Sequence, residues 1–467
     1  MTTHYDLIVI GSGAGSKLAR PAAQKGLKAA IIEKDKLGGT CLNRGCIPSK
    51  LMIHPADVGL EIREAKKFDI KNDPKFSVNF KKLMERINNT TDSDSNKIKT
   101  WYESKKIENL DFYHGEAKFV EDKVIEINGE LISGDKIVIA VGARPFIPPI
   151  KGLDSTPYWT STEALRARVQ PKKLIVIGGG YIGVELGHAY SGLGTEVEFI
   201  VREKGCLALV DKDAREEFER VFEQRHKIHV STDTKEVSYD EKKKEFTVTF
   251  DDHTSGKLKK IKGDQVLVAT GVKPNNDLLH LETTSIKTTP RGFIEVNKNM
   301  ETSLPGVYAL GDCVGNYMFR HSANFEAEYL YDKLINEKKG EIEYPPMPWA
   351  VFTNPQIAGV GLTQDQLEAM GKVEGEDFIV GKHEYRHSAM GEALLSETGF
   401  VKLIFDKNGY FLGSTIIGAE ASNMIHMAII LLTMHATIDD FFKFIYIHPA
   451  LPEVFRNAAR TAKAKLK

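Results

Sequence analysis

The same short pattern occurs twice in this chain: an apolar run, a glycine-rich turn, a helical stretch and a second apolar run. The first copy covers residues 5–33 and contains GSGAGS at 11–16, and the second covers residues 173–201 and contains GGGYIG at 178–183. A strand, a glycine turn, a helix and a parallel strand form the unit that binds dinucleotides. Two copies predict an α/β protein with two Rossmann-like dinucleotide-binding domains, one for a tightly held flavin and one for an exchangeable nicotinamide.

The first copy has the features of a working nucleotide site. Gly11 and Gly13 would let the backbone approach a pyrophosphate, and the helix that follows would offer free N–H groups to it. Ser16 stands at the third glycine position and is small enough for the helix to pack closely on the strand. Glu33 ends the second strand, where a carboxylate can accept hydrogen bonds from ribose hydroxyls. An ordinary glycine turn is the competing interpretation, but it does not account for the strand, helix and terminal acid together.

The second copy has all three glycines, Gly178, Gly180 and Gly183. An NAD site would place an acid at the end of the second strand, where this chain has Val201. Arg202 follows, and a cation there suits the 2′-phosphate of NADPH. The pattern therefore favours NADPH over NADH. The alternative interpretation of Arg202 is a solvent-exposed surface charge.

Two of the four cysteines, Cys41 and Cys46, lie close together in GGTCLNRGCIPSK. Pro48 predicts a helix that begins near Cys46, and a helix N-terminus stabilises a thiolate. A pair at this spacing can close a small, easily reduced disulfide loop. A zinc site would need further Cys or His ligands at short spacing, which the neighbouring sequence lacks, so we expect no metal. Two buried structural cysteines are the remaining alternative.

Two further pairs of side chains suit redox chemistry. Lys50 lies on the helix predicted after the cysteines, where a cation would favour hydride acceptance by a flavin, and Glu185 in the second fingerprint helix could pair with it. His448 and Glu453 lie in the proline-stiffened segment IHPALPE. A carboxylate can fix the tautomer of an imidazole and raise its pKa, which is the arrangement of a general base and its orienting group. Ordinary structural charges are the alternative for both pairs.

Taken together and in this order, these segments resemble the pyridine nucleotide–disulfide oxidoreductases, which include dihydrolipoamide dehydrogenase, glutathione reductase, mycothione reductase and mercuric reductase. The resemblance covers essentially the whole chain, and GGTCLNRGCIPSK is its most specific motif. It implies FAD at the first site and NADPH or NADH at the second. It also implies a small disulfide or dithiol substrate.

The resemblance also assigns roles to individual residues. It implies that Cys41 is the thiol that exchanges with substrate and that Cys46 is the thiol beside the flavin. Lys50 and Glu185 match the pair near the flavin ring. His448 and Glu453 match an acid–base dyad that reaches the active site of the partner subunit in a homodimer. Three further nucleotide-site positions match Gly142, Gly271 and Asp312.

Some positions depart from the family pattern and leave the substrate open. Ala208 stands where NADP-using members often have a second arginine, and Val201 and Ile447 differ from typical lipoamide dehydrogenases. We expect a dihydrolipoamide dehydrogenase-like enzyme, with or without a multienzyme complex. An NADPH-dependent reductase of a low-molecular-weight disulfide, similar to mycothione reductase, is the alternative. A flavin-based redox sensor and a transhydrogenase of the same fold are further alternatives.

Length and charge limit the remaining possibilities. A chain of 467 residues predicts several domains, and a formal net charge of −1 lacks the basic excess of proteins that bind nucleic acid or membrane surfaces. We see no apolar run long enough to span a membrane and no signal peptide, so a cytoplasmic location is expected.

Proline-rich segments predict the boundaries between domains. We expect an FAD-binding domain of residues 1–150 and 276–343, an NAD(P)-binding domain of 151–275, and an α+β dimerisation domain of 344–467. Within the first domain, residues 50–110 look mostly helical, and NNTTDSDS at 88–95 is typical of a helix junction or loop.

Overall fold

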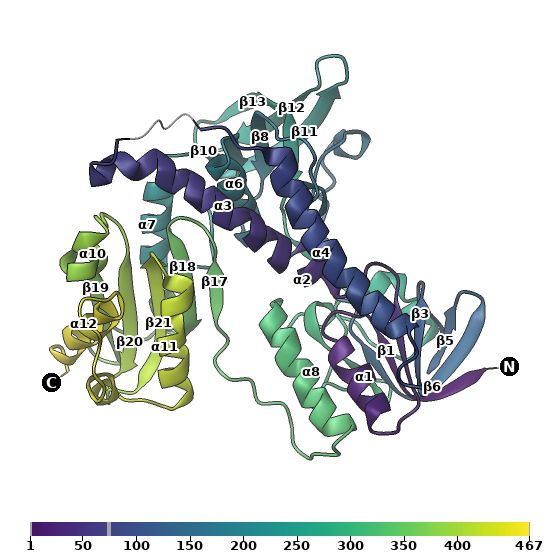
Figure 1. Cartoon of the computed structure of the whole chain (residues 1–467). Helices are drawn as coiled ribbons and strands as arrows, with labels where there is room; N and C mark the ends of the chain where they lie inside the picture. Colours follow the sequence, from purple (N-terminus) through teal and green to yellow (C-terminus); the bar gives the residue numbers. More distant parts are fainter. Residues whose placement is uncertain (1, 72–75, 467) are drawn as a thin grey trace.

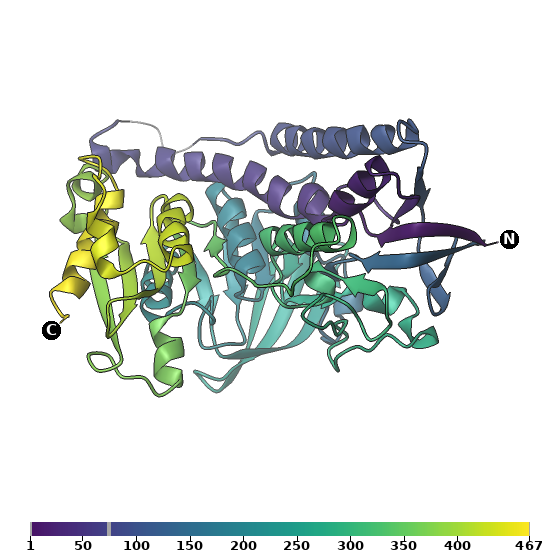
Figure 2. The same ribbon diagram turned by 90° about the horizontal axis from the view of Figure 1, so that it is seen from below.

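The structure of the protein is a computed structural model that describes residues 2–71 and 76–466. The chain forms three parts: an α/β part built from two separate stretches of sequence, a second α/β part inserted between them, and a C-terminal α+β part. The long helices α3 (Cys46–Glu64) and α4 (Phe80–Glu103) run along one side (Figures 1 and 2). This arrangement confirms the predicted fold class. Within the described ranges, no helix is both long enough and apolar enough to cross a membrane.

The first part is built on a seven-stranded sheet of order β3-β2-β1-β6-β5-β4, with β16 also paired to β6. Its central strands are parallel and apolar on both faces, because helices α1 and α8 cover one face and a β-meander with loops covers the other. The elements are β1 (Thr3–Ile10), β2 (Ala29–Glu33), β3 (Leu110–His114), β4 (Lys118–Glu121), β5 (Val124–Ile127), β6 (Glu130–Ile139), β16 (Val307–Ala309), α1 (Ser16–Gln24) and α8 (Arg320–Leu334).

Helices α2 (Gly39–Arg44), α3 and α4 follow β2. The expected junction at 88–95 is wrong, because α4 runs through it without a break. Two of the polar side chains in this stretch are buried: Thr91 bonds back to the Asn88 carbonyl, and Ser95 donates to the Leu37 carbonyl at 2.8 Å. A bond within the helix and the tertiary bond from Ser95 to Leu37 therefore override a local sequence that favours turns.

The second part repeats the nucleotide-binding unit with a four-stranded parallel sheet of order β10-β9-β8-β14 and an antiparallel sheet β11-β12-β13. A two-stranded ribbon, β7 with β15, joins it to the first part. The elements are β7 (Ala143–Pro145), α5 (Ser161–Ala164), β8 (Lys173–Ile177), α6 (Tyr181–Gly192), β9 (Glu196–Ile200), α7 (Lys212–Phe222), β10 (Lys227–His229), β11 (Thr232–Asp240), β12 (Glu245–Asp252), β13 (Lys257–Gly263), β14 (Gln265–Val268) and β15 (Val272–Pro274).

The third part is a five-stranded antiparallel sheet of order β17-β18-β21-β20-β19. Helices α11 and α12 pack on one of its faces and form a separate apolar core with it. The elements are β17 (Trp349–Val351), β18 (Gln356–Gly361), α9 (Gln364–Ala369), β19 (Phe378–Glu384), α10 (Ala389–Ala393), β20 (Phe400–Asp406), β21 (Phe411–Gly418), α11 (Ala421–Thr433) and α12 (Pro452–Lys463).

Candidate active site

The two neighbouring thiols lie where helix α2 gives way to α3. Cys41 is on α2 and Cys46 is the first residue of α3, and both are free thiols. A hydrogen bond from Cys46, with the positive charges of Arg320 and Lys50, outweighs burial and lowers the pKa of Cys41 to about 7. The same hydrogen bond raises the pKa of Cys46. The structure thus describes a reduced pair in which Cys41 is the more acidic of the two thiols.

Lys50 and Glu185 meet beside the thiols. Lys50 Nζ donates to Glu185 Oε2 at 2.7 Å and lies 4.0 Å from the centroid of the Phe352 ring. The other oxygen of Glu185 accepts the Phe352 N–H at 3.0 Å. Glu185 therefore links α3 and α6 to the residue that follows β17 in the third part. Within residues 2–71 and 76–466, no three His, Cys, Asp or Glu side chains gather closely enough to hold a metal ion.

The first glycine turn has the shape that a dinucleotide needs. A Cβ on Gly11 would lie 2.3 Å from the Ala140 carbonyl oxygen, so only glycine allows the strand and the turn to meet. A Cβ on Gly142 would meet nothing within 4 Å, so Gly142 borders open space, whereas one on Gly13 would touch the Arg320 guanidinium at 3.6 Å and Gly39 at 3.9 Å. Glu33 accepts the backbone N–H of the turn's second residue at 2.9 Å. These residues fit FAD, whose pyrophosphate would lie at the start of α1 with its ribose near Glu33.

The close contact between helix and strand in this turn is made at Gly15, which the sequence analysis did not single out. A Cβ on Gly15 would lie 2.4 Å from the Gly11 carbonyl oxygen. Ser16 begins α1 and donates its hydroxyl to the Gly13 carbonyl at 2.9 Å. Helix α1 begins five residues after Gly11, whereas α6 begins three residues after Gly178. The close approach to the first glycine's carbonyl therefore falls at Gly15, four residues after Gly11, in the first turn and at Gly183, five residues after Gly178, in the second.

A cation was also missed. Arg320, the first residue of α8, faces the turn and influences the pKa of both Cys41 and Asp312. Burial raises the pKa of Asp312, and the guanidinium of Arg320 opposes this rise. The only available signal was a cation shortly after the Gly-Asp pair. Sequence spacing could not place it beside Cys41, since the two residues are joined only through the tertiary fold.

The second fingerprint repeats this geometry. A Cβ on Gly178 would lie 2.3 Å from the Ala269 carbonyl oxygen, and one on Gly183 would lie 2.4 Å from the Gly178 carbonyl oxygen. Gly180 and Gly271 would place a Cβ in open space. Gly178 and Gly183 therefore allow the strand, the turn and the helix to pack closely. Gly180 and Gly271 border the space that a nicotinamide dinucleotide would fill.

The structure places Arg202 on the surface, just after the second strand of this nucleotide-binding unit. Its guanidinium donates to Glu203 Oε1 at 3.0 Å, and 80% of its side chain is exposed. Val201, where an acid would bind the 2′-hydroxyl, is fully buried. A phosphate at this position would have to compete with Glu203 for Arg202.

His448 and Glu453 form a pair at the start of α12. His448 Nδ1 lies 3.0 Å from Glu453 Oε2, and the same carboxylate accepts the Ala450 N–H and a hydrogen bond from Arg456. Burial favours protonation of Glu453, but these hydrogen bonds outweigh it and lower its pKa. The carboxylate is nearly buried, whereas 71% of the His448 side chain is exposed.

Within one chain this pair does not meet the thiols. Helix α12 lies in the third part, and α2 lies near the centre of the molecule (Figure 1). The residues before His448 expose apolar surface: Ile445 is 99% exposed and Ile447 is 79% exposed. An acid–base pair on an apolar, uncovered surface indicates a site that another chain completes.

The fold and the sequence place the chain in one family. Residues 5–327 match the profile of the pyridine nucleotide-disulphide oxidoreductases, and residues 347–459 match the dimerisation domain of the same family. The chain therefore belongs to the pyridine nucleotide-disulphide oxidoreductases. It is an FAD-dependent oxidoreductase that uses a nicotinamide dinucleotide and acts on disulfides.

Individual relatives match over nearly their whole length. The chain is 34% identical over 459 residues to dihydrolipoyl dehydrogenase of Thermus scotoductus, covering 97% of this chain and 96% of that one. It is also 34% identical to dihydrolipoyl dehydrogenase of Bacillus subtilis, covering 98% and 96%. A solved structure, the Cu(II) complex of the HOCl-induced flavoprotein disulfide reductase RclA from Escherichia coli, superposes with a TM-score of 0.86 at 25% identity and covers both chains in full.

Proposed function

We propose that this protein catalyses dithiol–disulfide exchange between a nicotinamide coenzyme and a lipoamide-type substrate through the couple Cys41–Cys46. The observation that carries the proposal is the reduced pair at the start of α3, with the pKa of Cys41 lowered to about 7. The charge of Lys50, which pairs with Glu185, acts on Cys41, and the first glycine turn meets the start of α2 where Gly13 lies against Gly39. Relatives named dihydrolipoyl dehydrogenase support lipoamide as the substrate class.

The chain's own residues account for the exchange steps. FAD, when bound in the first cradle, supplies the two-electron chemistry that connects a nicotinamide with a disulfide. In the reducing direction, the Cys41 thiolate attacks one sulfur of the substrate disulfide and releases the other as a thiolate, which takes a proton from His448. Cys46 then gives its proton to the now neutral His448, and its thiolate attacks Cys41. This step forms the Cys41–Cys46 disulfide and breaks the mixed disulfide, so the second substrate sulfur leaves as a thiolate. The dihydrolipoamide reaction is the reverse sequence.

The acid–base pair is proposed to come from the partner subunit of a homodimer. Its support is the exposed imidazole, the exposed apolar side chains of Ile445 and Ile447, and the match of residues 347–459 to the dimerisation domain. Glu453 would hold His448 Nδ1 and leave Nε2 to exchange protons with the substrate sulfur.

A second candidate function is NADPH-dependent reduction of a low-molecular-weight disulfide. Val201 removes the acid that would bind the 2′-hydroxyl of NADH, and Arg202 provides a cation for a 2′-phosphate. We therefore propose that NADPH is accepted at the second cradle. Exchange of Arg202 for alanine should raise KM for NADPH more than KM for NADH. Equal changes, or no change, would show that Arg202 does not contact the phosphate.

The deciding experiment is a steady-state comparison of substrates. NADH and NADPH are each tested with oxidised lipoamide and with small disulfides such as glutathione disulfide, and dihydrolipoamide is tested with NAD and NADP. The expected result is turnover of lipoamide that Cys46→Ser abolishes, while reduction of ferricyanide by NAD(P)H continues. Hydride transfer from NADPH to an NAD analogue that survives Cys46→Ser, with no lipoamide turnover in the unaltered enzyme, would instead indicate a transhydrogenase. Absence of any thiol turnover would indicate a redox sensor.

A further inference from the structure

An arginine from the nicotinamide-binding part holds the segment that carries the two thiols. Helix α2 spans only Gly39–Arg44, so its last carbonyl groups have no partner within the helix. Arg166 donates from NH2 to the Asn43 carbonyl at 2.8 Å. Asn43 lies between Cys41 and Cys46 in the sequence. The guanidinium thus caps the end of the helix that carries Cys41, with a charge-assisted hydrogen bond.

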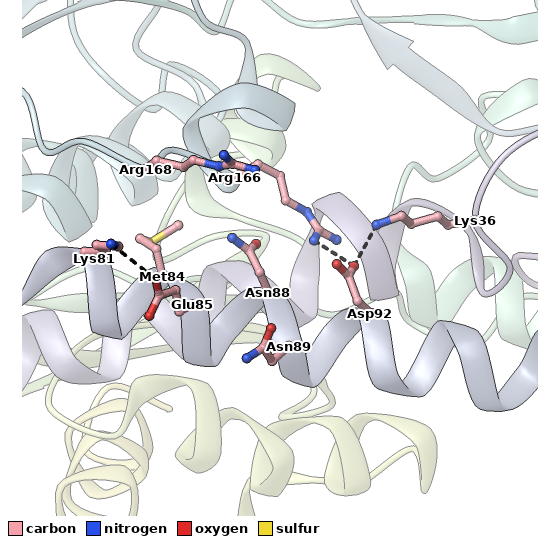
Figure 3. A pocket seen from close by; sticks show the side chains of 9 residues that line it. All are labelled: Lys36, Lys81, Met84, Glu85, Asn88, Asn89, Asp92, Arg166 and Arg168. Atoms are coloured by element: carbon pink, nitrogen blue, oxygen red, sulfur yellow. Dashed lines mark hydrogen bonds and ion pairs between the residues drawn. The ribbon is translucent and has the colours of Figure 1, made fainter.

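Arg166 is itself fixed on two sides. Its NH1 donates to Asp92 Oδ1 at 2.7 Å, and its NH2 also reaches the Thr91 hydroxyl at 3.2 Å. The same Asp92 oxygen accepts from Lys36 Nζ at 2.8 Å. Figure 3 shows Arg166 reaching across a cavity of about 670 Å³ to Asp92 on α4, with Lys36 on the far side. Burial opposes ionisation of Asp92, but its two cationic partners outweigh this and lower its pKa.

The residues around the thiols are also held by hydrogen bonds from a side chain of α2 itself. The buried Asn43 side chain donates from Nδ2 to the carbonyls of Lys36, Leu37 and Gly39, at 3.2, 3.0 and 3.0 Å. Ser95 on α4 donates to the Leu37 carbonyl as well. Among the hydrogen bonds of the described residues, the bond from Arg166 is the only one that joins the second part to the backbone of residues 36–46, which carry the two thiols. Arg166 therefore ties the end of α2 to the part that binds the nicotinamide.

We propose that Arg166 is a positioning residue for the Cys41–Cys46 couple. By capping the Asn43 carbonyl it fixes α2 relative to α3, and so fixes where the two sulfurs stand in the reduced pair. This proposal rests on the proposed function, in which that couple turns over disulfides. A disulfide forms only within narrow limits of separation and angle. Under this proposal the cap stabilises the reduced pair more than the disulfide, so that its loss makes the couple harder to reduce and slows each exchange step.

The test compares Arg166→Ala with Arg168→Ala in the FAD-loaded enzyme. Arg168 lines the same cavity, is exposed, and makes no hydrogen bond or ion pair with another described residue, so it controls for loss of charge. Asp92→Asn is a second variant, which keeps Arg166 but weakens its anchor. Three quantities are measured: lipoamide turnover, ferricyanide reduction by NAD(P)H, and the midpoint potential of the thiol couple from anaerobic titration.

In Arg166→Ala we expect kcat for disulfide turnover to fall roughly 10- to 100-fold, because small displacements of reacting atoms cost that much. We expect the midpoint potential to fall by about 30 mV, which corresponds to a tenfold change in the exchange equilibrium. Ferricyanide reduction, which bypasses the thiols, should stay unchanged, and Asp92→Asn should shift the first two quantities less, in the same direction.

Two results would overturn the proposal. Equal effects of Arg166→Ala and Arg168→Ala would show that the bond to Asn43 does not matter. A parallel loss of ferricyanide and lipoamide turnover would show that Arg166 only supports the fold. If the unaltered enzyme turns over no disulfide at all, the proposed function fails, and the potential of the couple still tests the role of Arg166.

Discussion

At the scale of single residues, the reactivity of the site depends on charges that surround Cys41. The pKa of this thiol is lowered from 9.0 to about 7, so its thiolate fraction rises with pH through neutrality, well below the range of an ordinary cysteine. Alkylation of the reduced enzyme by iodoacetamide should therefore accelerate with a midpoint near pH 7, and Cys41→Ser should remove that phase.

The guanidinium of Arg320 supplies part of this effect. Arg320→Met removes one of the positive charges that favour the Cys41 thiolate, so the alkylation midpoint should move to higher pH and the rate at pH 7 should fall several-fold. The measurement is the pH profile of alkylation in the two proteins. An unchanged profile would mean that the hydrogen bond from Cys46 sets the pKa without help from Arg320.

Glu453 should matter through its charge as well as its shape. Glu453→Gln keeps a hydrogen-bond acceptor for His448 but removes the charge that stabilises the imidazolium. We expect kcat for disulfide turnover to fall about 100-fold. Ferricyanide reduction serves as the control, and a matching loss there would contradict an acid–base role.

At the scale of elements, a buried ion pair fixes the third part on the second. Lys402 on β20 donates to Asp211, which precedes α7, at 2.9 Å, and the two side chains are 1% and 0% exposed. Asp211 also accepts the Gln364 N–H at 3.2 Å. A charge buried this deeply is tolerated only while its partner is present.

Lys402→Met should therefore destabilise the protein by about 3–5 kcal/mol, because it leaves the Asp211 carboxylate buried without its cation. The measurement is the thermal unfolding midpoint. The double change Lys402→Met with Asp211→Leu should recover much of the loss. Lys382→Met is the matched control, since Lys382 pairs with Asp213 at a partly exposed position and should cost less than about 1 kcal/mol. Equal losses in the two single variants would contradict this account.

At the scale of the whole molecule, the thiols and their acid–base pair belong to different parts of one chain (Figure 1). If each active site combines two subunits, His448→Gln and Cys41→Ser are each inactive as homodimers but complement one another. Dissociation and random reassociation of an equal mixture should restore roughly a quarter of normal activity, because half of the dimers are mixed and each contains one intact site. No recovery, with mixed dimers shown to form, would contradict a shared site.

Local sequence was sufficient for the nucleotide-binding units and for the chemistry of the site. The period of the apolar runs, the glycines that alone permit a turn against the Ala140 or Ala269 carbonyl, and the Cys-x4-Cys spacing all act over a few residues. Such features depend on backbone sterics that neighbouring residues determine. They predicted the fold class and the family, and they identified the positions of Cys41, Cys46 and Lys50.

Only the tertiary structure decided what distant segments do to one another. It turned NNTTDSDS into the middle of α4, because buried hydrogen bonds to Leu37 and Asn88 replaced the turn that the local sequence favours. It placed a close contact between turn and helix at Gly15, and it brought Arg320 and Arg166 to the residues around the two thiols. These outcomes depend on contacts between residues far apart in the chain, and neither the periodicity of a sequence nor the spacing of its motifs contains that information.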